Sequence, residues 1–122
     1  MIRYNINPRQ DYKEKIEKIG FNFHTDYWIE NAVYSFTQAE IEQIERASNV
    51  CYEMYCKAVQ YIIDNNLFDM LCIPLPVRDK IIESWENDDL SLYGRFDFTI
   101  KDGIPKLLEF NADTPTSLLE AS

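Results

Sequence analysis

The pattern of apolar and polar positions over residues 37–66 has a helical period. Apolar or small side chains recur three and four residues apart, at Ile41, Ile44, Ser48, Cys51, Tyr55, Ala58 and Ile62. This spacing predicts a long amphipathic helix that begins at the capping box Thr37-Gln38-Ala39-Glu40 and ends near Asn65-Asn66. We expect its apolar face to pack in a core rather than in a coiled-coil dimer, because the stripe is shorter than a sustained heptad repeat.

A shorter helix is predicted near the amino terminus. Asn7 followed by Pro8 is typical of a helix start. The apolar positions that follow at near-helical spacing are Tyr12, Ile16 and Ile19. Gly20 is placed to end this helix in a left-handed conformation.

A third helix is predicted over residues 77–86. Its expected buried positions are Ile81, Ile82 and Trp85. Pro74 and Pro76 would keep the preceding segment extended, because a residue before proline avoids the helical region.

Residues 93–111 change to the period of two that is typical of strands. Polar Arg95, Asp97 and Thr99 alternate with Phe96, Phe98 and Ile100, and Leu107, Glu109 and Asn111 alternate with Leu108 and Phe110. Each strand would therefore have one polar and one apolar face, and the two strands predict a β-hairpin. Four polar residues on it, the polar quartet, are Arg95, Asp97, Glu109 and Asn111.

The loop between the two strands decides whether the polar faces coincide. A two-residue turn at Asp102-Gly103 would send Asp97 and Glu109 to opposite sides of the sheet. A three-residue loop over residues 101–103, with glycine in a left-handed bulge position, would pair Arg95 with Glu109 and gather the quartet on one face. We predict the three-residue loop, because the other register puts polar groups on the phenylalanine face, where they are costly.

The polar quartet has the chemistry of a divalent-cation site beside a phosphate. Carboxylates from Asp97 and Glu109 and an amide oxygen from Asn111 are hard ligands that suit Mg²⁺, which keeps waters and substrate phosphates in its other positions. Arg95 would add a planar cation suited to a phosphoryl group or an oxyanion. The alternative is a surface hairpin on which Arg95 and Glu109 form an ordinary cross-strand pair.

Composition limits the partners and the compartment. The 122 residues carry a net charge of -9, which disfavours nucleic acid and anionic membranes as partners, and their 46% hydrophobic content predicts one packed domain over residues 1–122. No apolar run approaches the ~20 residues that span a bilayer, and the amino terminus lacks the apolar core of a signal peptide. Cys51, Cys56 and Cys72 suggest neither a disulfide framework nor a zinc site, which favours the cytoplasm.

Other conspicuous side chains have structural explanations. His24 is the only histidine, and we expect a structural role rather than general-base catalysis with Asp26. The aromatic residues that follow it are Tyr27, Trp28, Tyr34 and Phe36. We expect these rings to form a small core between helices, with a ligand platform as the alternative.

Two runs in the last third of the chain carry a family resemblance. They are RFDF, from Arg95, and PKLLEFNADTPTSLLEAS, from Pro105. Further matches are Ser84-Trp85 and Leu92-Tyr93-Gly94 and, more loosely, His24, Tyr27-Trp28, Glu30 and Phe36-Thr37. Over most of its length the chain thus resembles the glutathionylspermidine synthase family. These ATP-grasp ligases activate a carboxylate as an acyl phosphate and transfer it to an amine.

The resemblance implies a role for each member of the polar quartet. Arg95 would contact the transferred phosphate or the tetrahedral intermediate. The Mg²⁺ ligands would be Asp97, Glu109 and Asn111.

The resemblance also implies substrates. The loop after the second strand resembles the acid-substrate loop of the family, whose binding residues would be Thr114, Thr116 and Ser117. The acid would be a glutathione-like peptide and the amine a polyamine-like molecule, with ATP as co-substrate.

The chain is shorter than the ligases that it resembles, which run to several hundred residues with the ATP-binding lobe after the matched segment. A glycine-rich phosphate loop is missing, because the glycines are Gly20, Gly94 and Gly103 alone. Thr114 followed by Pro115 predicts the start of a further helix. We interpret the chain as an amino-terminal fragment, inactive alone, that exposes an apolar face through which it self-associates.

The predicted fold class is α/β. A small mixed or antiparallel sheet would end in the hairpin and be packed by about three helices, with residues 21–23 and 70–73 as further strands, resembling the lobe that precedes the ATP-grasp lobe. Two functions stay open. One is the substrate-side part of an ATP- and Mg²⁺-dependent carboxylate–amine ligase, and the other is a stand-alone, non-catalytic binding module derived from that lobe.

Overall fold

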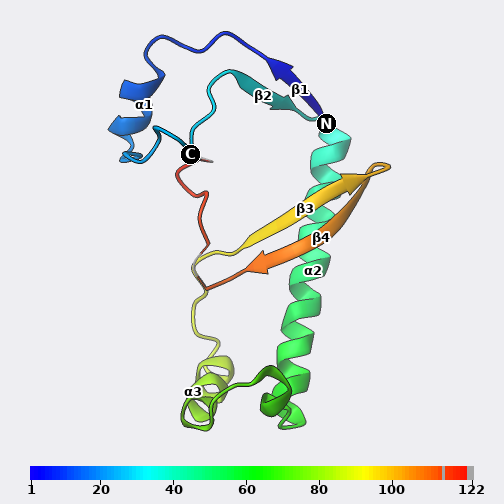
Figure 1. Ribbon diagram of the computed structural model, residues 1–122. Helices are drawn as coiled ribbons and strands as arrows, with labels where there is room; N and C mark the ends of the chain where they lie inside the picture. Colours follow the sequence, from blue (N-terminus) through cyan, green and yellow to red (C-terminus); the bar gives the residue numbers. More distant parts are fainter. Residues whose placement is uncertain (114, 121–122) are drawn as a thin grey trace. The chain divides into compact units, whose positions relative to one another are not determined.

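The computed structural model describes residues 1–113 and 115–120, which divide into two compact units. The first unit comprises Met1–Ile44 and Gly94–Ser122, and the second comprises Glu45–Tyr93. The elements in chain order are β1 (Ile2–Asn5), α1 (Tyr12–Lys18), β2 (Ala32–Ser35), α2 (Gln38–Asp64), the 3₁₀ helix η1 (Phe68–Leu71), α3 (Leu75–Glu86), β3 (Arg95–Lys101) and β4 (Ile104–Asn111) (Figure 1). Helices and small antiparallel sheets confirm the α/β class. The single domain stays a prediction.

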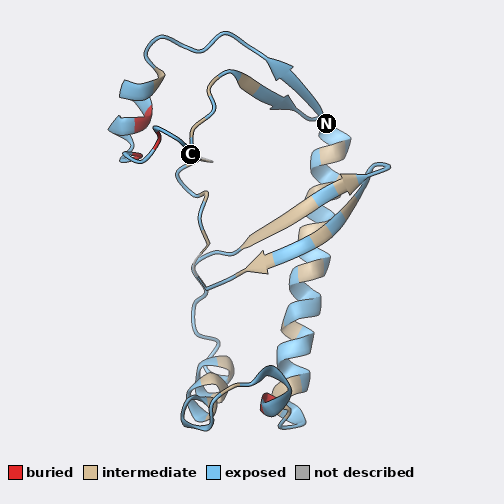
Figure 2. Cartoon of the chain, viewed as in Figure 1, coloured by how far each residue is buried: buried red, intermediate tan, exposed pale blue. Residues whose placement is uncertain are grey.

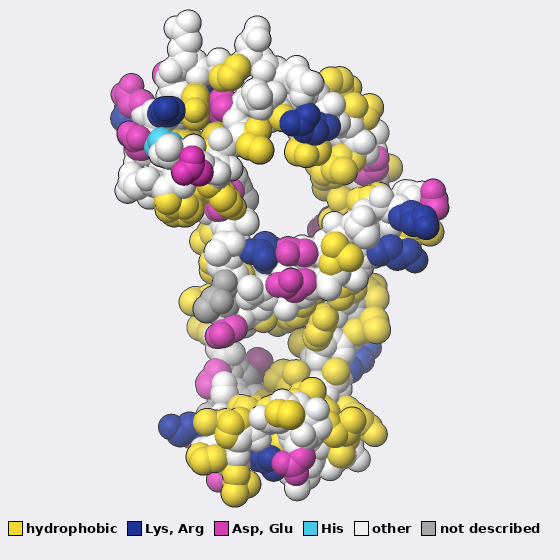
Figure 3. Space-filling view, in the orientation of Figure 1, with side chains coloured by type: hydrophobic (Ala, Val, Ile, Leu, Met, Phe, Trp, Pro, Cys, Tyr) yellow, Lys and Arg dark blue, Asp and Glu magenta, His cyan; other side chains and the backbone are white. Residues whose placement is uncertain are grey.

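Few of the described side chains are buried. Those of the first unit lie in and just after α1, at Ile16, Phe21 and His24, and Phe68 is the one in the second unit (Figure 2). Hydrophobic side chains are prominent on the visible surface of both units (Figure 3). No helix in the described residues is long and apolar enough to cross a membrane.

Helix α1 begins later than the sequence predicts. Its first residue is Tyr12, preceded by Asp11 at the N-cap position, whereas Asn7-Pro8 had suggested an earlier start. The end is as predicted, because Gly20 has a φ of 91° and the N–H of Phe21 donates to the carbonyl of Ile16 over 3.0 Å. Phe21 therefore belongs to the end of helix α1, and the strand predicted at residues 21–23 is wrong.

Strands β1 and β2 were not predicted. They form an antiparallel pair in which Ile2 lies opposite Ser35 and Asn5 lies opposite Ala32. Every residue of β1 is exposed, so this strand has no buried face that would give it a visible alternation of apolar and polar positions.

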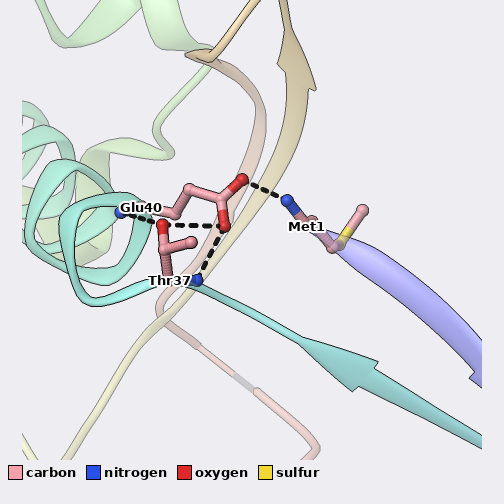
Figure 4. Close-up of polar contacts among 3 residues, drawn as sticks. All are labelled: Met1, Thr37 and Glu40. Carbon is pink, nitrogen blue, oxygen red and sulfur yellow. Dashed lines mark hydrogen bonds and ion pairs between the residues drawn. The ribbon is translucent and has the colours of Figure 1, made fainter.

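Helix α2 begins at the capping box that the sequence predicts (Figure 4). The N–H of Glu40 donates to Thr37 Oγ1 over 3.2 Å, and Glu40 Oε2 accepts from the N–H of Thr37 over 2.8 Å. The terminal amine of Met1 also pairs with the Glu40 carboxylate. The expected core packing of α2 is wrong, because none of its described side chains is buried.

In the second unit, the strand predicted at residues 70–73 is wrong. The N–H groups of Cys72 and Ile73 donate to carbonyls a few residues back, and Cys72 has a φ of 54°, so the segment is a 3₁₀ turn. The buried ring of Phe68 lies under the guanidinium of Arg78, which donates twice to the carbonyl of Ile73. Helix α3 starts at Leu75, two residues earlier than predicted.

The hairpin of β3 and β4 is confirmed, but its turn is not the predicted one. Lys101 pairs with Ile104 across a two-residue turn, whose φ values are 52° at Asp102 and 76° at Gly103. The three-residue loop is therefore wrong, since Asp-Gly readily takes the two positive φ angles of a tight hairpin turn. The register then shifts between Asp97 and Phe98, which leaves Leu108 as the extra residue of a β-bulge.

Candidate functional site

The polar quartet lies on one face of the hairpin, as predicted, but by a different route. Asp97 is directly opposite Glu109, and Arg95 is directly opposite Asn111. Residues opposite each other in an antiparallel pair share a face, and so do residues two apart in a regular strand. The predicted pairing of Arg95 with Glu109 is wrong, because the two-residue turn and the bulge each move the partner by one position.

The opposite face of the hairpin holds the strands together. The rings of Phe96 and Phe110 are stacked with centroids 4.2 Å apart, and Phe98 lies 5.8 Å from Phe96. A Cβ atom added to Gly94 would come within 2.6 Å of the Phe110 ring, so the chain enters β3 in close contact with this stack. The aromatic face thus fixes the backbone that carries the quartet.

Arg95 connects the quartet to the loop after β4. Its Nε donates to Asp97 Oδ1 over 2.7 Å and its Nη2 to Oδ2 over 3.2 Å, which is a two-pronged pair. Its Nη1 donates to Thr116 Oγ1 over 2.6 Å. The structure therefore brings one predicted acid-binding residue to the guanidinium that was predicted to contact the transferred phosphate or the tetrahedral intermediate.

This pairing sets the charge states of Arg95 and Asp97. The hydrogen bond from Arg95 lowers the pKa of Asp97, with partial burial opposing it and the charge of Arg95 assisting. The same hydrogen bond raises the pKa of Arg95, and the charge of Glu109 contributes. Asp97 is consequently held as a carboxylate, the form that ligates metal ions.

The donor set of the quartet fits a hard divalent cation. Two carboxylates and one amide oxygen occupy neighbouring positions on one face, from Asp97, Glu109 and Asn111. Within residues 1–113 and 115–120, no three His, Cys, Asp or Glu side chains gather to hold a metal, so the set depends on the Asn111 amide. Magnesium tolerates such a small protein ligand set, because it keeps several waters.

The loop after β4 is only partly as predicted. Thr114 lies outside the described residues. Thr116 reaches Arg95, and Ser117 is half-buried with a φ of 79°, which is uncommon for a residue with a side chain. Residues 118–120 form a turn and not the start of a helix.

One residue near the site was not among the predicted site residues. The hydroxyl of Tyr27 donates to Glu120 Oε1 over 3.0 Å, and it also interacts with Ser117 and with the charge of Arg95. The sequence predicts Tyr27 as part of an aromatic core with Trp28, Tyr34 and Phe36, but this is wrong, because Tyr27, Tyr34 and Phe36 are exposed. The Tyr27 ring does lie 5.9 Å from that of buried Phe21. The loose match of Tyr27-Trp28 to the family was the one signal for a second role.

His24 has the structural environment that was expected. It is 8% exposed, and its Nε2 lies 2.8 Å from Glu17 Oε1. This pair gives the buried ring a polar partner within the chain, and the absence of a catalytic role stays a prediction.

Comparison with known proteins places this chain in a family. Residues 3–122 match the model of the family described as glutathionylspermidine synthase preATP-grasp. The chain belongs to this family. It is also 35% identical over 121 residues to a protein of Haemophilus influenzae named "Putative acid--amine ligase". The match covers 93% of this chain and 31% of that relative, so the chain spans about a third of the relative's length.

Proposed function

We propose that this chain is the substrate-side part of an ATP- and Mg²⁺-dependent carboxylate–amine ligase of the glutathionylspermidine synthase type. The observation that carries the proposal is the polar quartet, in which Asp97 faces Glu109 and Arg95 faces Asn111. Family membership and the name of the relative support a ligase. Because the chain spans about a third of that relative, we assign the proposed activity to a protein of the relative's full length rather than to these 122 residues alone.

The proposed reaction has two steps. A carboxylate oxygen of the acid attacks the γ-phosphorus of ATP, and ADP leaves. The amine nitrogen then attacks the acyl carbon, inorganic phosphate leaves as the amide forms, and the nitrogen loses its proton to solvent. Magnesium held by Asp97, Glu109 and Asn111 would neutralise negative charge on the phosphates.

Arg95 has two tasks in this proposal. Its planar guanidinium would stabilise the negative charge that develops on the transferred phosphoryl group and on the tetrahedral intermediate. Through Nη1 it also holds Thr116, so that the acid-binding loop and the phosphate-binding face share one cation. Its raised pKa keeps it charged throughout the physiological range.

The proposal is tested with the protein made from the complete natural coding sequence that contains residues 1–122. Phosphate release from ATP is measured with Mg²⁺, glutathione as the acid and spermidine as the amine. Asp97→Asn should reduce the rate by at least ~100-fold, because an anionic metal ligand becomes a neutral amide that binds Mg²⁺ more weakly. Asp102→Asn is the matched control, since it removes a carboxylate at the turn, where φ is 52° and asparagine is tolerated.

Two outcomes would overturn the proposal. Phosphate release at the parental rate by the Asp97→Asn protein would remove the metal site from the reaction. Binding of glutathione or spermidine with equal affinity with and without ATP, together with no ATP turnover, would instead indicate the non-catalytic binding module.

A further inference from the structure

The loop over residues 115–120 is fastened to the rest of the first unit at two points. At one point Thr116 accepts a hydrogen bond from Arg95 over 2.6 Å. At the other, Glu120 accepts a hydrogen bond from the hydroxyl of Tyr27 over 3.0 Å. Ser117 lies between these points in a left-handed conformation. The loop that carries the proposed acid-binding hydroxyls is thus held by a hydrogen bond near each end, and we call these two hydrogen bonds the clasp.

The Tyr27 side of the clasp comes from a well-fixed part of the chain. The Tyr27 ring lies 5.9 Å from the ring of Phe21, which is fully buried, and 6.1 Å from that of Phe23. The N–H of Tyr27 donates to the carbonyl of His24 over 3.2 Å. Ring and backbone are therefore held by the small core after α1, and the hydroxyl is presented at a defined place.

The hydroxyl is also exposed and chemically suited to hold the loop. Tyr27 is 54% exposed, so a ligand in the loop can come close to it. The hydrogen bond to Glu120 raises the pKa of Tyr27, which keeps the phenol protonated and able to donate at neutral pH. A neutral donor to a carboxylate makes one of the stronger kinds of hydrogen bond.

We propose that Tyr27 is a positioning residue for the acid substrate, which acts by clasping the loop over residues 115–120 against Arg95. This inference rests on the proposed ligase function. A loop that is already held in its binding conformation loses less conformational entropy when the acid binds. Loss of the clasp should therefore weaken the acid complex and leave the nucleotide complex unchanged.

The test compares Tyr27→Phe with Tyr34→Phe in the protein from the complete natural coding sequence. Tyr27→Phe keeps the ring contacts and removes only the hydroxyl, whereas Tyr34 is an exposed tyrosine of β2 outside the clasp. For Tyr27→Phe we expect the KM for glutathione to rise roughly tenfold, with kcat and the KM for ATP within about twofold of the parent. Tyr34→Phe should match the parent in all three constants.

A double-mutant cycle tests whether Tyr27 acts through Glu120. Glu120→Met, which removes the acceptor oxygen at similar side-chain length, should raise the KM for the acid by itself, and adding Tyr27→Phe should have little further effect, because both changes break one contact. Fully additive effects of the two substitutions would overturn the clasp.

Amide hydrogen exchange gives a readout that does not require turnover. Without substrate, the amides of residues 116–120 should exchange faster in Tyr27→Phe than in Tyr34→Phe. A protein without ligase activity would overturn the proposed function, and the exchange comparison would still decide the clasp. If the protein is an active ligase, unchanged amide exchange in Tyr27→Phe would overturn the inference. Faster exchange with an unchanged KM for glutathione would also overturn it, since the clasp would then have only a structural role.

Discussion

Asp97 lies directly opposite Glu109 across the hairpin, although the two-residue turn alone would place them on opposite faces. The bulge at Leu108 brings the two carboxylates together. Like charges directly opposite each other in a sheet repel, and Arg95 beside Asp97 offsets part of that repulsion. A divalent cation would offset the rest.

Removal of the Glu109 charge should therefore have opposite effects with and without Mg²⁺. In the absence of Mg²⁺, Glu109→Gln should raise the melting temperature slightly, because the repulsion between the carboxylates is relieved. In the presence of Mg²⁺, the parent protein should be stabilised, and Glu109→Gln should bind the ion at least roughly tenfold more weakly. Thermal melts over a Mg²⁺ titration measure both effects, with exposed Glu45→Gln as the control. Equal stabilisation of all three proteins would show that the ion binds elsewhere.

The two-pronged pair of Arg95 and Asp97 should be visible in pH titrations. Arg95→Lys keeps the charge and loses the fork, so the pKa of Asp97 should rise towards its usual value of 3.8. A carboxyl whose pKa is lowered by folding adds stability above its usual pKa, and this stability is lost as the pH falls through the lowered value. The variant should thus be less stable than the parent at neutral pH, and the difference should shrink in acid. Carboxyl NMR titration decides this, and an unchanged pKa would contradict it.

Glu30 makes a second pH-dependent contribution to the folding stability of the first unit. Its carboxylate pairs with Arg9 and accepts from Trp28 Nε1 over 2.8 Å, and the hydrogen bond from Arg9 is the main cause that lowers its pKa from 4.5 to about 2. Because the folded pKa is the lower one, this stability is present above pH 4.5 and disappears between pH 4.5 and about 2.

The indole N–H signal of Trp28 in NMR spectra reports on this pair. It should move with an apparent pKa near 2, and Glu30→Gln should abolish that transition. A transition near 4.5 in the parent would show that the pair does not hold in solution.

Gly94→Ala should disturb the hairpin through its aromatic face. The new Cβ atom would lie 2.6 Å from Phe110 Cε2, so the ring must leave its stack with Phe96. Overpacking of this kind costs about 1–3 kcal/mol, measured as a loss of free energy of unfolding. Gly103→Asn is the control, because no atom lies within 4 Å of its added Cβ and asparagine tolerates the φ of 76°. Equal stability of the two variants would contradict the tight contact.

Exposed leucines should make the 122-residue chain self-associate. Leu90 is 97% exposed and Leu92 is 93% exposed, in a segment without regular secondary structure. Exposed apolar surface of this kind favours association. Light scattering should show a mass that rises with concentration, and Leu90→Ser with Leu92→Ser should reduce the rise. A clean monomer at every concentration would count against the prediction.

Local signals made part of this fold predictable. The start of α2 follows from the capping box, since Thr37 and Glu40 satisfy each other's backbone N–H groups within one turn. The shared face of the quartet followed from the cost of polar groups among phenylalanines, although the turn was assigned wrongly. The adjacent Leu107 and Leu108 were the signal for the bulge, because Leu107 is the cross-strand partner of Phe98 and Leu108 has no partner in the register.

Contacts between distant segments could not be predicted in the same way. The hydrogen bond from Tyr27 to Glu120 joins residues that are 93 positions apart. No periodic pattern records such a contact, since periodicity reports only which face of an element is covered. The pairing of β1 with β2 escaped prediction for the same reason, as neither strand has a buried side chain.

The bulge at Leu108 has a consequence for the lengths that this hairpin can adopt. Loss of Leu108 would join Leu107 to Glu109, and an uninterrupted ladder would then retain every cross-strand partner seen now. Loss of Leu107 would give the same sequence, because the two neighbouring residues are both leucine. The Leu107-Leu108 pair is therefore a place where one residue can be removed from this strand without dispersing the charged groups.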